Sequence, residues 1–272
     1  MFTVRVSNST QTVFELVDEI IAPLRQVVPR RPSPMEYLDP DFCLPAVFGD
    51  QPPPDGGDLV AEAEAYTRFV AGMAALGLVA KDGSIAPEAV GLYRAFRGGF
   101  IRGVVTGVFA DRSDPLEVRF FGDEDNAAVL TVSGEQATLR AGALRGIAEW
   151  ALDDLPDPPG GPGEVIEIHA DERGVIPGRH GPLLASVREA ANRPRLGTVL
   201  VDLTVRDTII AEHPHGSMGL LDNDLGRYLL ATAIDPSGHW VFWFAPATRA
   251  RAEQWIVQMV RHYGAGGQVG LS

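Results

Sequence analysis

The chain has 272 residues, of which 45% are hydrophobic and 22% charged, as is typical of a folded globular protein. Its formal net charge of −13 argues against a nucleic-acid partner or insertion at an anionic membrane, because both need a basic protein surface. The one cysteine, Cys43, excludes an intramolecular disulfide and a cysteine-based metal cage. Neither a signal peptide nor a run of 18 apolar residues is visible, so we expect a cytoplasmic protein.

The N-terminal part predicts a short strand and two helices separated by prolines. Residues 1–7 alternate like a strand, and residues 10–25 have helical periodicity. The apolar face of this first helix comprises Val13, Phe14, Leu16, Val17, Ile20 and Ile21. The proline-rich segment 29–54 interrupts the chain before a second predicted helix at residues 59–76.

The next part predicts a helix, four strands and another helix. Pro87 occupies a position where the first turn of a helix tolerates proline. β-Branched and aromatic residues, punctuated by turn residues, predict an antiparallel meander. Its strands are expected at residues 101–110, 116–121, 127–133 and 136–140. A helix at residues 143–152 closes this part of the chain.

A second part follows the clearest linker in the chain, residues 157–163, which are rich in proline and glycine. We expect a strand at residues 164–169, a helix at 182–192 and a strand at 198–206. Residues 212–224 have low propensity for regular structure and predict a loop. The predicted elements that come after this loop are a strand at 227–234, the turn 235–238, a strand at 239–244, a helix through Trp255, and a frayed tail from Gly264.

The same order of elements therefore occurs twice, in residues 87–155 and again in residues 182–263. A period of about 90–100 residues is too long for a solenoid, whose repeats span about 20–50. We interpret the chain as one domain over residues 1–272, with halves of about 1–156 and 164–263. The expected fold class is α+β, with a mainly antiparallel central sheet formed by two halves related by a quasi-twofold axis and flanked by helical bundles.

Candidate catalytic residues lie between positions 213 and 222. His215-Gly-Ser-Met-Gly219 resembles the nucleophile elbow of α/β-hydrolases, but His215 stands where that turn requires glycine. The imidazoles of His213 and His215, with the Asp222 carboxylate, are possible metal ligands, although no third histidine has matching spacing. A metal-dependent or serine hydrolase that uses His213, His215, Ser217 and Asp222 is therefore kept as an alternative. Asp222-Asn-Asp-Leu-Gly226 is better explained as a turn than as a calcium-binding loop, and Gly226 would supply an unusual φ in that turn.

The strand at residues 239–244 has no polar face, since Val241 and Trp243 alternate with Trp240, Phe242 and Phe244. One explanation is a central strand covered by helices on both sides. The other is that one face is left open for a partner, because exposed aromatic patches mark protein interfaces. Met218, Leu220 and Leu221 would extend such a patch.

Several segments together carry a family resemblance over residues 60–263. In the second half they are the 182–192 helix with Arg193-Pro-Arg-Leu-Gly197, the 199–206 strand, Asp222-Asn-Asp-Leu-Gly-Arg-Tyr-Leu229, and residues 240–247 before the last helix. In the first half they are Leu76-Gly-Leu78, Asp82-Gly83, the 127–140 hairpin and the acidic helix ending at Leu155-Pro156. In these segments the chain resembles the EspG family, cytosolic chaperones of mycobacterial and actinobacterial type VII (ESX) secretion systems.

The resemblance implies a chaperone and not an enzyme, with no cofactor, metal or ATP. Its expected partner is a PE–PPE heterodimer, bound through the hydrophobic tip of the PPE subunit, which stays soluble and competent for secretion. The family implies contacts on the sheet and the C-terminal helical region, which by position indicates Trp240, Phe242, Phe244, Leu220 and Met218. A homodimer of the free protein, or a purely structural homodimer joined through the sheet, is the remaining alternative.

Overall fold

The computed structural model describes residues 11–27, 74, 78, 84, 86, 89–133, 136–206, 212–235 and 237–264. Five predictions lie outside these residues: the strand at 1–7, the proline-rich segment 29–54, nearly all of the helix at 59–76, the position of Pro87 in the first turn of a helix, and the tail after Gly264. Among the described residues, no helix is long and apolar enough to cross a membrane.

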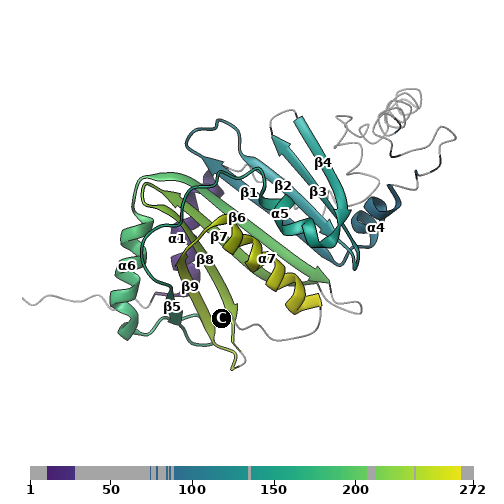
Figure 1. The fold of residues 1–272 in the computed structure, drawn as a ribbon. Coiled ribbons are helices and arrows are strands. Elements are labelled where there is room, and N and C mark those ends of the chain that lie inside the picture. Colours follow the sequence, from purple (N-terminus) through teal and green to yellow (C-terminus); the bar gives the residue numbers. More distant parts are fainter. Residues whose placement is uncertain are drawn as a thin grey trace, which may run out of the picture.

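The core of the fold is one nine-stranded sheet, in the order β4-β3-β2-β1-β6-β7-β8-β9-β5 (Figure 1). Each pair of neighbouring strands is antiparallel. The strands are β1 (Ile101–Phe109), β2 (Leu116–Gly122), β3 (Asn126–Ser133), β4 (Gln136–Ala143), β5 (Ile166–His169), β6 (Arg195–Arg206), β7 (Glu212–Asn223), β8 (Gly226–Ile234) and β9 (Trp240–Pro246). The predicted α+β class with an antiparallel sheet is confirmed.

The elements repeat in the predicted order. The first half runs from α4 (Val90–Gly98) through β1–β4 to α5 (Ile147–Leu152), after a single 3-10 turn at Leu144–Gly146. The second runs from α6 (Gly181–Ala191) through β6–β9 to α7 (Arg249–Gly264). The first strand of each half meets the other at the centre, where β1 pairs with β6 from Ile101↔Val205 to Phe109↔Gly197. Strand β5 extends the second half only, by pairing with β9.

Helices cover both faces of the sheet because both faces are apolar. Helices α5 and α7 lie on one face, and their apolar residues share a core with alternate residues of β1, β2, β6 and β7. On the other face α1 (Val13–Val27) and α6 bury Leu221, Leu230 and Phe242, and α4 buries Phe121. Helix α1 begins with a capping box, in which Thr12 and Glu15 exchange side-chain hydrogen bonds with each other's backbone N–H, at 2.9 and 3.2 Å.

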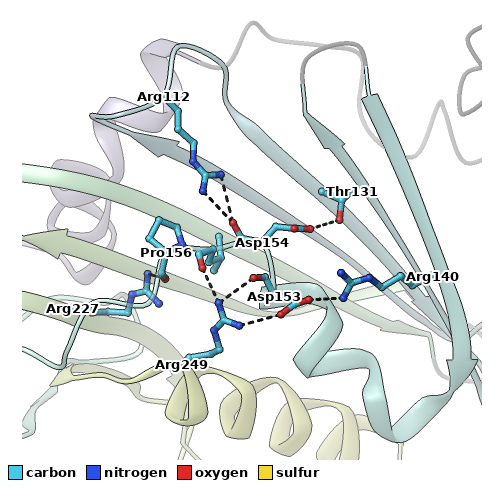
Figure 2. Close-up of polar contacts among 9 residues, drawn as sticks. Arg112, Thr131, Arg140, Asp153, Asp154, Pro156, Arg227 and Arg249 are labelled. Atoms are coloured by element: carbon cyan, nitrogen blue, oxygen red, sulfur yellow. Dashed lines mark hydrogen bonds and ion pairs between the residues drawn. The ribbon is translucent and has the colours of Figure 1, made fainter.

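Arginines from both halves converge on residues 153–156, directly after α5 (Figure 2). Arg140 of β4 and Arg249 of α7 donate to the Asp153 carboxylate at 2.6 and 3.3 Å. Arg249 also donates to the Leu155 carbonyl at 2.8 Å, and Arg227 of β8 to the Pro156 carbonyl at 2.7 Å. Carbonyls after a helix lack intrahelical partners, so these guanidinium groups satisfy them and join the two halves.

Asp153 gives this junction a pH dependence. Its hydrogen bond from Arg140 holds its pKa below the ordinary value, and Arg249 adds to the effect. A depressed pKa means that the ionised carboxylate stabilises the fold above the unfolded value of about 3.9, and that this contribution is lost as the pH falls through the folded value. Urea titrations can measure the free energy of unfolding of the parent and of Asp153→Asn at several pH values. As the pH falls from 5 to about 2, we expect this free energy to decrease less in the variant than in the parent. Arg140→Gln should behave similarly, whereas parallel pH profiles for Asp153→Asn and the parent would contradict the assignment.

The linker at residues 157–163 has no helix or strand, as predicted, but it is held against the start of β8. The Arg227 N–H donates to the Pro159 carbonyl at 2.8 Å, and the Gly161 N–H donates to the Arg227 carbonyl at 2.9 Å. Gly226 has a φ of +127°, and a Cβ there would lie 2.5 Å from the Pro159 oxygen. The predicted unusual φ of Gly226 is confirmed, and it allows the linker to pass this closely.

The prediction of a loop at residues 212–224 is wrong, because residues 212–223 form strand β7. Glycines and a proline weaken its local strand propensity. Two neighbours compensate, since β7 pairs with β6 along its length and with β8 from Met218 to Asn223. The register of the β6–β7 pairing shifts between Leu203 and Thr204, and this shift accommodates the segment around Pro214.

Candidate partner-binding surface

The five residues expected to bind a partner lie on opposite faces of the sheet. Met218 and Leu220 are fully buried in the core beneath α5 and α7. Phe242 and Phe244 belong to the other core, together with α1 and α6, and they are 0% and 3% exposed. Side chains of a strand alternate between faces, so these residues do not form one exposed patch. The apolar strand β9 is thus covered on both sides, and direct partner contacts by the five residues stay a prediction.

Trp240 is the most accessible of the five. It is partly buried, and its ring meets Phe14 of α1 edge-to-face, with centroids 4.8 Å apart. Phe14 itself is 46% exposed, although the helical pattern placed it on the apolar face. This aromatic pair lies at the border of the core shared by α1, α6 and β9.

The structure instead has a groove beneath α7, on the opposite face of β9. We call it the α7 groove, and its volume is about 550 Å³. Its lining residues are Val165, Glu167, Leu229, Trp243, Ala245, Thr248, Ala250, Arg251, Gln254, Trp255 and Gln258. They come from β8, β9, the segment that begins β5, and α7, which lies across the sheet in Figure 1.

The α7 groove has an apolar floor and a polar rim. Leu229, Ala245 and Trp255 are each at most 5% exposed, so they form the floor. Trp243 is half-buried, and its indole Nε1 donates to the Glu167 carboxylate at 3.1 Å. Glu167 also lies 2.7 Å from Nε2 of His169. An apolar floor with a few oriented polar groups is typical of a protein-binding or ligand-binding concavity.

The family resemblance implied contacts in the C-terminal helical region, but the sequence prediction named no residue of α7, although a signal was present. Arg251, Gln254, Trp255 and Gln258 are spaced i, i+3, i+4 and i+7, which places them on one face of a helix. A face that combines one tryptophan with glutamines and an arginine is too polar for a core and too apolar for a fully solvated surface. Trp243 is likewise absent from the five residues expected to bind a partner, because the sequence does not show which face of β9 is accessible.

The residues of the alternative hydrolase hypothesis are not assembled into a site. The Ser217 hydroxyl donates to the Asp202 carboxylate at 2.7 Å, whereas Asp222 binds Arg227 through both oxygens, at 2.7 and 2.8 Å. Positions 217 and 222 of β7 have opposite parity, so their side chains lie on opposite faces of the sheet. The side chains of His213 and His215 lie outside the described residues.

Asp202 is the nearest approach to an activated group in this region. Neighbouring atoms partly desolvate its carboxylate and so raise its pKa above the ordinary value, although the residue is exposed, and the hydrogen bond from Ser217 opposes that shift. A carboxylate that accepts from a serine hydroxyl, without an imidazole between them, is not an acyl-transfer arrangement. Among the described residues, no three His, Cys, Asp or Glu side chains are grouped to hold a metal ion.

Comparison with known proteins places the chain in a defined family and fold. The model of the EspG family matches residues 37–258, which is more than half of the chain. A similar solved structure is the Mycobacterium tuberculosis type VII secretion system chaperone EspG5 in complex with the PE25–PPE41 dimer. Its TM-score is 0.51 at 15% identity, over 71% of this chain and 84% of that one. No curated protein matches the chain in sequence.

Proposed function

Because the chain belongs to the EspG family, we propose that it is a cytoplasmic chaperone of a type VII secretion system. Its partner would be a PE–PPE heterodimer, bound through the PPE-type subunit. The observation that carries this proposal is the family match over residues 37–258, together with a fold shared with a chaperone that was solved with a PE–PPE dimer. The function requires binding alone, so we propose no catalytic step, and the hydrolase alternative is not favoured.

We propose that the α7 groove receives an apolar segment of the PPE-type subunit. Its tryptophans, Trp243 and Trp255, offer the aromatic surface that dominates binding energy at protein interfaces. The glutamines of α7 and Arg251 can bond the backbone of a bound segment along the rim. A stable complex needs about 1,200–2,000 Å² of buried surface, so the groove would be the centre of a larger interface.

The mechanism is protection by mass action. An apolar tip that is covered by the chaperone cannot associate with another copy, so the free concentration of the aggregation-prone form falls. The groove is lined by β5, β9 and α7. Strand β5 is hydrogen-bonded to β9, and Trp243 of β9 packs against the same core as the apolar residues of α7. It is therefore preformed, which lowers the entropic cost of binding.

Filling the groove tests the proposal. Ala250 lies on the rim and is exposed, so Ala250→Trp should leave the fold intact while obstructing the groove. We expect at least about tenfold weaker binding to the cognate PE–PPE dimer, measured by calorimetry, which corresponds to about 1.4 kcal/mol. The matched control is Ala185→Trp on α6, an exposed position across the sheet, and its affinity should equal that of the parent.

Two failures of this experiment have different meanings. If Ala250→Trp binds as tightly as the parent, the complex forms elsewhere and the assignment of the groove is wrong. If the parent chain binds no PE–PPE dimer encoded in its own genome, the proposed function itself is wrong.

A further inference from the structure

We propose that strand β4 is a dimerisation edge, at which two copies of this chain pair antiparallel and join their sheets. Strand β4 ends the sheet on the side opposite to β9 and β5 (Figure 1). In the repeated order of elements, β4 of the first half corresponds to β9 of the second. Strand β9 is covered by β5, whereas no described strand covers β4. Among the described residues, the first half has no counterpart of β5, the strand that completes the second half.

The backbone of β4 shows which groups point outward. The Leu144 N–H donates to the Asp125 carbonyl at 2.8 Å, so position 144 faces β3. Backbone groups alternate along a strand, which directs those of Gly142 and Arg140 toward β3 as well. The N–H and C=O groups of Leu139, Ala141 and Ala143 then point away from the sheet. Both groups of Leu139 and Ala141, and the Ala143 N–H, have no backbone hydrogen-bond partner within the described part of the chain, whereas the Ala143 C=O accepts the first bond of the 3-10 turn that follows.

This edge has little of the protection that natural edge strands carry. Charged side chains, prolines or very short strands normally prevent edge-to-edge pairing. Strand β5, at the other end, follows this rule with four residues that include Glu167 and His169. Strand β4 has eight residues, and Thr138 and positions 140–143 are exposed. Arg140 is the one charged residue in β4, and three consecutive positions, 141–143, are alanine or glycine.

Two copies of β4 can pair antiparallel about a twofold axis at Ala141. With Ala141 opposite Ala141 of the second copy, Leu139 of each copy faces Ala143 of the other, and the outward N–H and C=O groups of the two copies can pair along the shared edge. Arg140 then lies opposite Gly142 of the second copy. The space at Gly142 is occupied by its own Trp150, since a Cβ there would be 2.7 Å from the indole ring. Each guanidinium therefore lies beside a partly exposed tryptophan of the other copy, a cation–π arrangement.

The pairing is compatible with an open α7 groove, and it does not depend on the proposed function. Seven strand spacings of about 4.8 Å separate β4 from β9, so the groove lies about 34 Å from the contact. A twofold pairing forms a closed dimer, because each copy contributes the same edge, β4, to the contact. The contact is smaller than a standard interface of about 1,600 Å², so we expect a dimer that dissociates in the micromolar range.

Sedimentation equilibrium of the full chain tests this proposal at concentrations up to about 200 μM. The parent should approach twice its 29.2 kDa mass as its concentration rises. Ala141→Lys and Ala141→Glu each place two like charges directly opposite one another, so each variant alone should stay monomeric. An equimolar mixture of the two should regain the dimer, because the charges then attract. The matched control, His169→Lys at the exposed opposite edge, should dimerise like the parent.

Several results would overturn the proposal. These are a parent that stays monomeric, a parent that forms larger assemblies, a dimer that persists in both single variants, or a mixture that stays monomeric. Amide hydrogen exchange of the parent provides a measurement that needs no variant. Exchange at Leu139, Ala141 and Ala143 should slow as concentration rises, and unchanged rates in a dimeric sample would also contradict pairing through β4.

Discussion

Replacing Arg227 with alanine should lower the free energy of unfolding by about 3–5 kcal/mol. The Arg227 side chain is 1% exposed and binds both oxygens of Asp222, whose side chain is 4% exposed. Removing the guanidinium leaves a buried carboxylate without its counter-charge, and the penalty is mainly the desolvation of that group. The variant also loses the hydrogen bond to the Pro156 carbonyl, and with it a link between the halves (Figure 2). Urea denaturation measures the effect.

Arg193→Ala is the matched control for this measurement. Arg193 pairs with Asp224 at the surface, where the two side chains are 44% and 37% exposed. Solvent screens such a pair, so the loss should be far smaller than for Arg227→Ala. The double variant Arg227→Met with Asp222→Leu removes both charges and should recover part of the loss. A similar, small effect for Arg193→Ala and Arg227→Ala would show that the buried pair is not as the structure has it.

Replacing Phe242 with alanine should lower the free energy of unfolding by about 3–5 kcal/mol, because the ring is fully buried. Phe242 lies between α1, α6 and β5 in the core of the second half, where no solvent can fill the space that the ring leaves. Phe242→Asp should prevent folding altogether, since it adds an unpaired buried charge. Neither variant is expected to weaken PE–PPE binding selectively, and circular dichroism with urea denaturation separates loss of fold from loss of binding.

Trp243→Ala, one residue further, is the contrasting variant. Trp243 faces the α7 groove and is half-buried, so the loss of stability should be smaller, about 1–2 kcal/mol. Its main effect should be on affinity for the PE–PPE dimer, since the groove loses an aromatic anchor. If Phe242→Ala keeps full stability and loses the partner, while Trp243→Ala keeps both, the two faces of β9 are assigned the wrong way round.

Much of the fold was visible in local patterns. Alternation in β1 and β2 and the helical period of α1 and α6 depend on which residues are apolar, and the structure has these elements within a few residues of the predicted bounds. The turns could also be predicted from neighbouring residues. Asn223 accepts from the Leu225 N–H, and Gly226 adopts the predicted positive φ, because both effects belong to short segments of chain. The duplicated order of elements followed from these local signals, and with it the antiparallel α+β class.

Strand β7 shows where local patterns fail. Its glycines and proline predict a loop, and only the pairing with β6 and β8 makes it a strand. Strand β6 pairs with this segment along its length and β8 pairs with residues 218–223, and the information for that pairing is spread over residues far apart in the chain.

Patterns of neighbouring residues encode most of the elements, their repetition and the family, but they do not encode strand β7. Only the tertiary structure decided which face of β9 is buried beneath which helix, that Met218 and Phe242 lie on opposite sides of the sheet, and that α7 leaves a groove beside Trp243. The physical reason is that a strand apolar on both faces has no local signal that ranks one face above the other. Exposure there depends on the packing of helices that are distant in sequence.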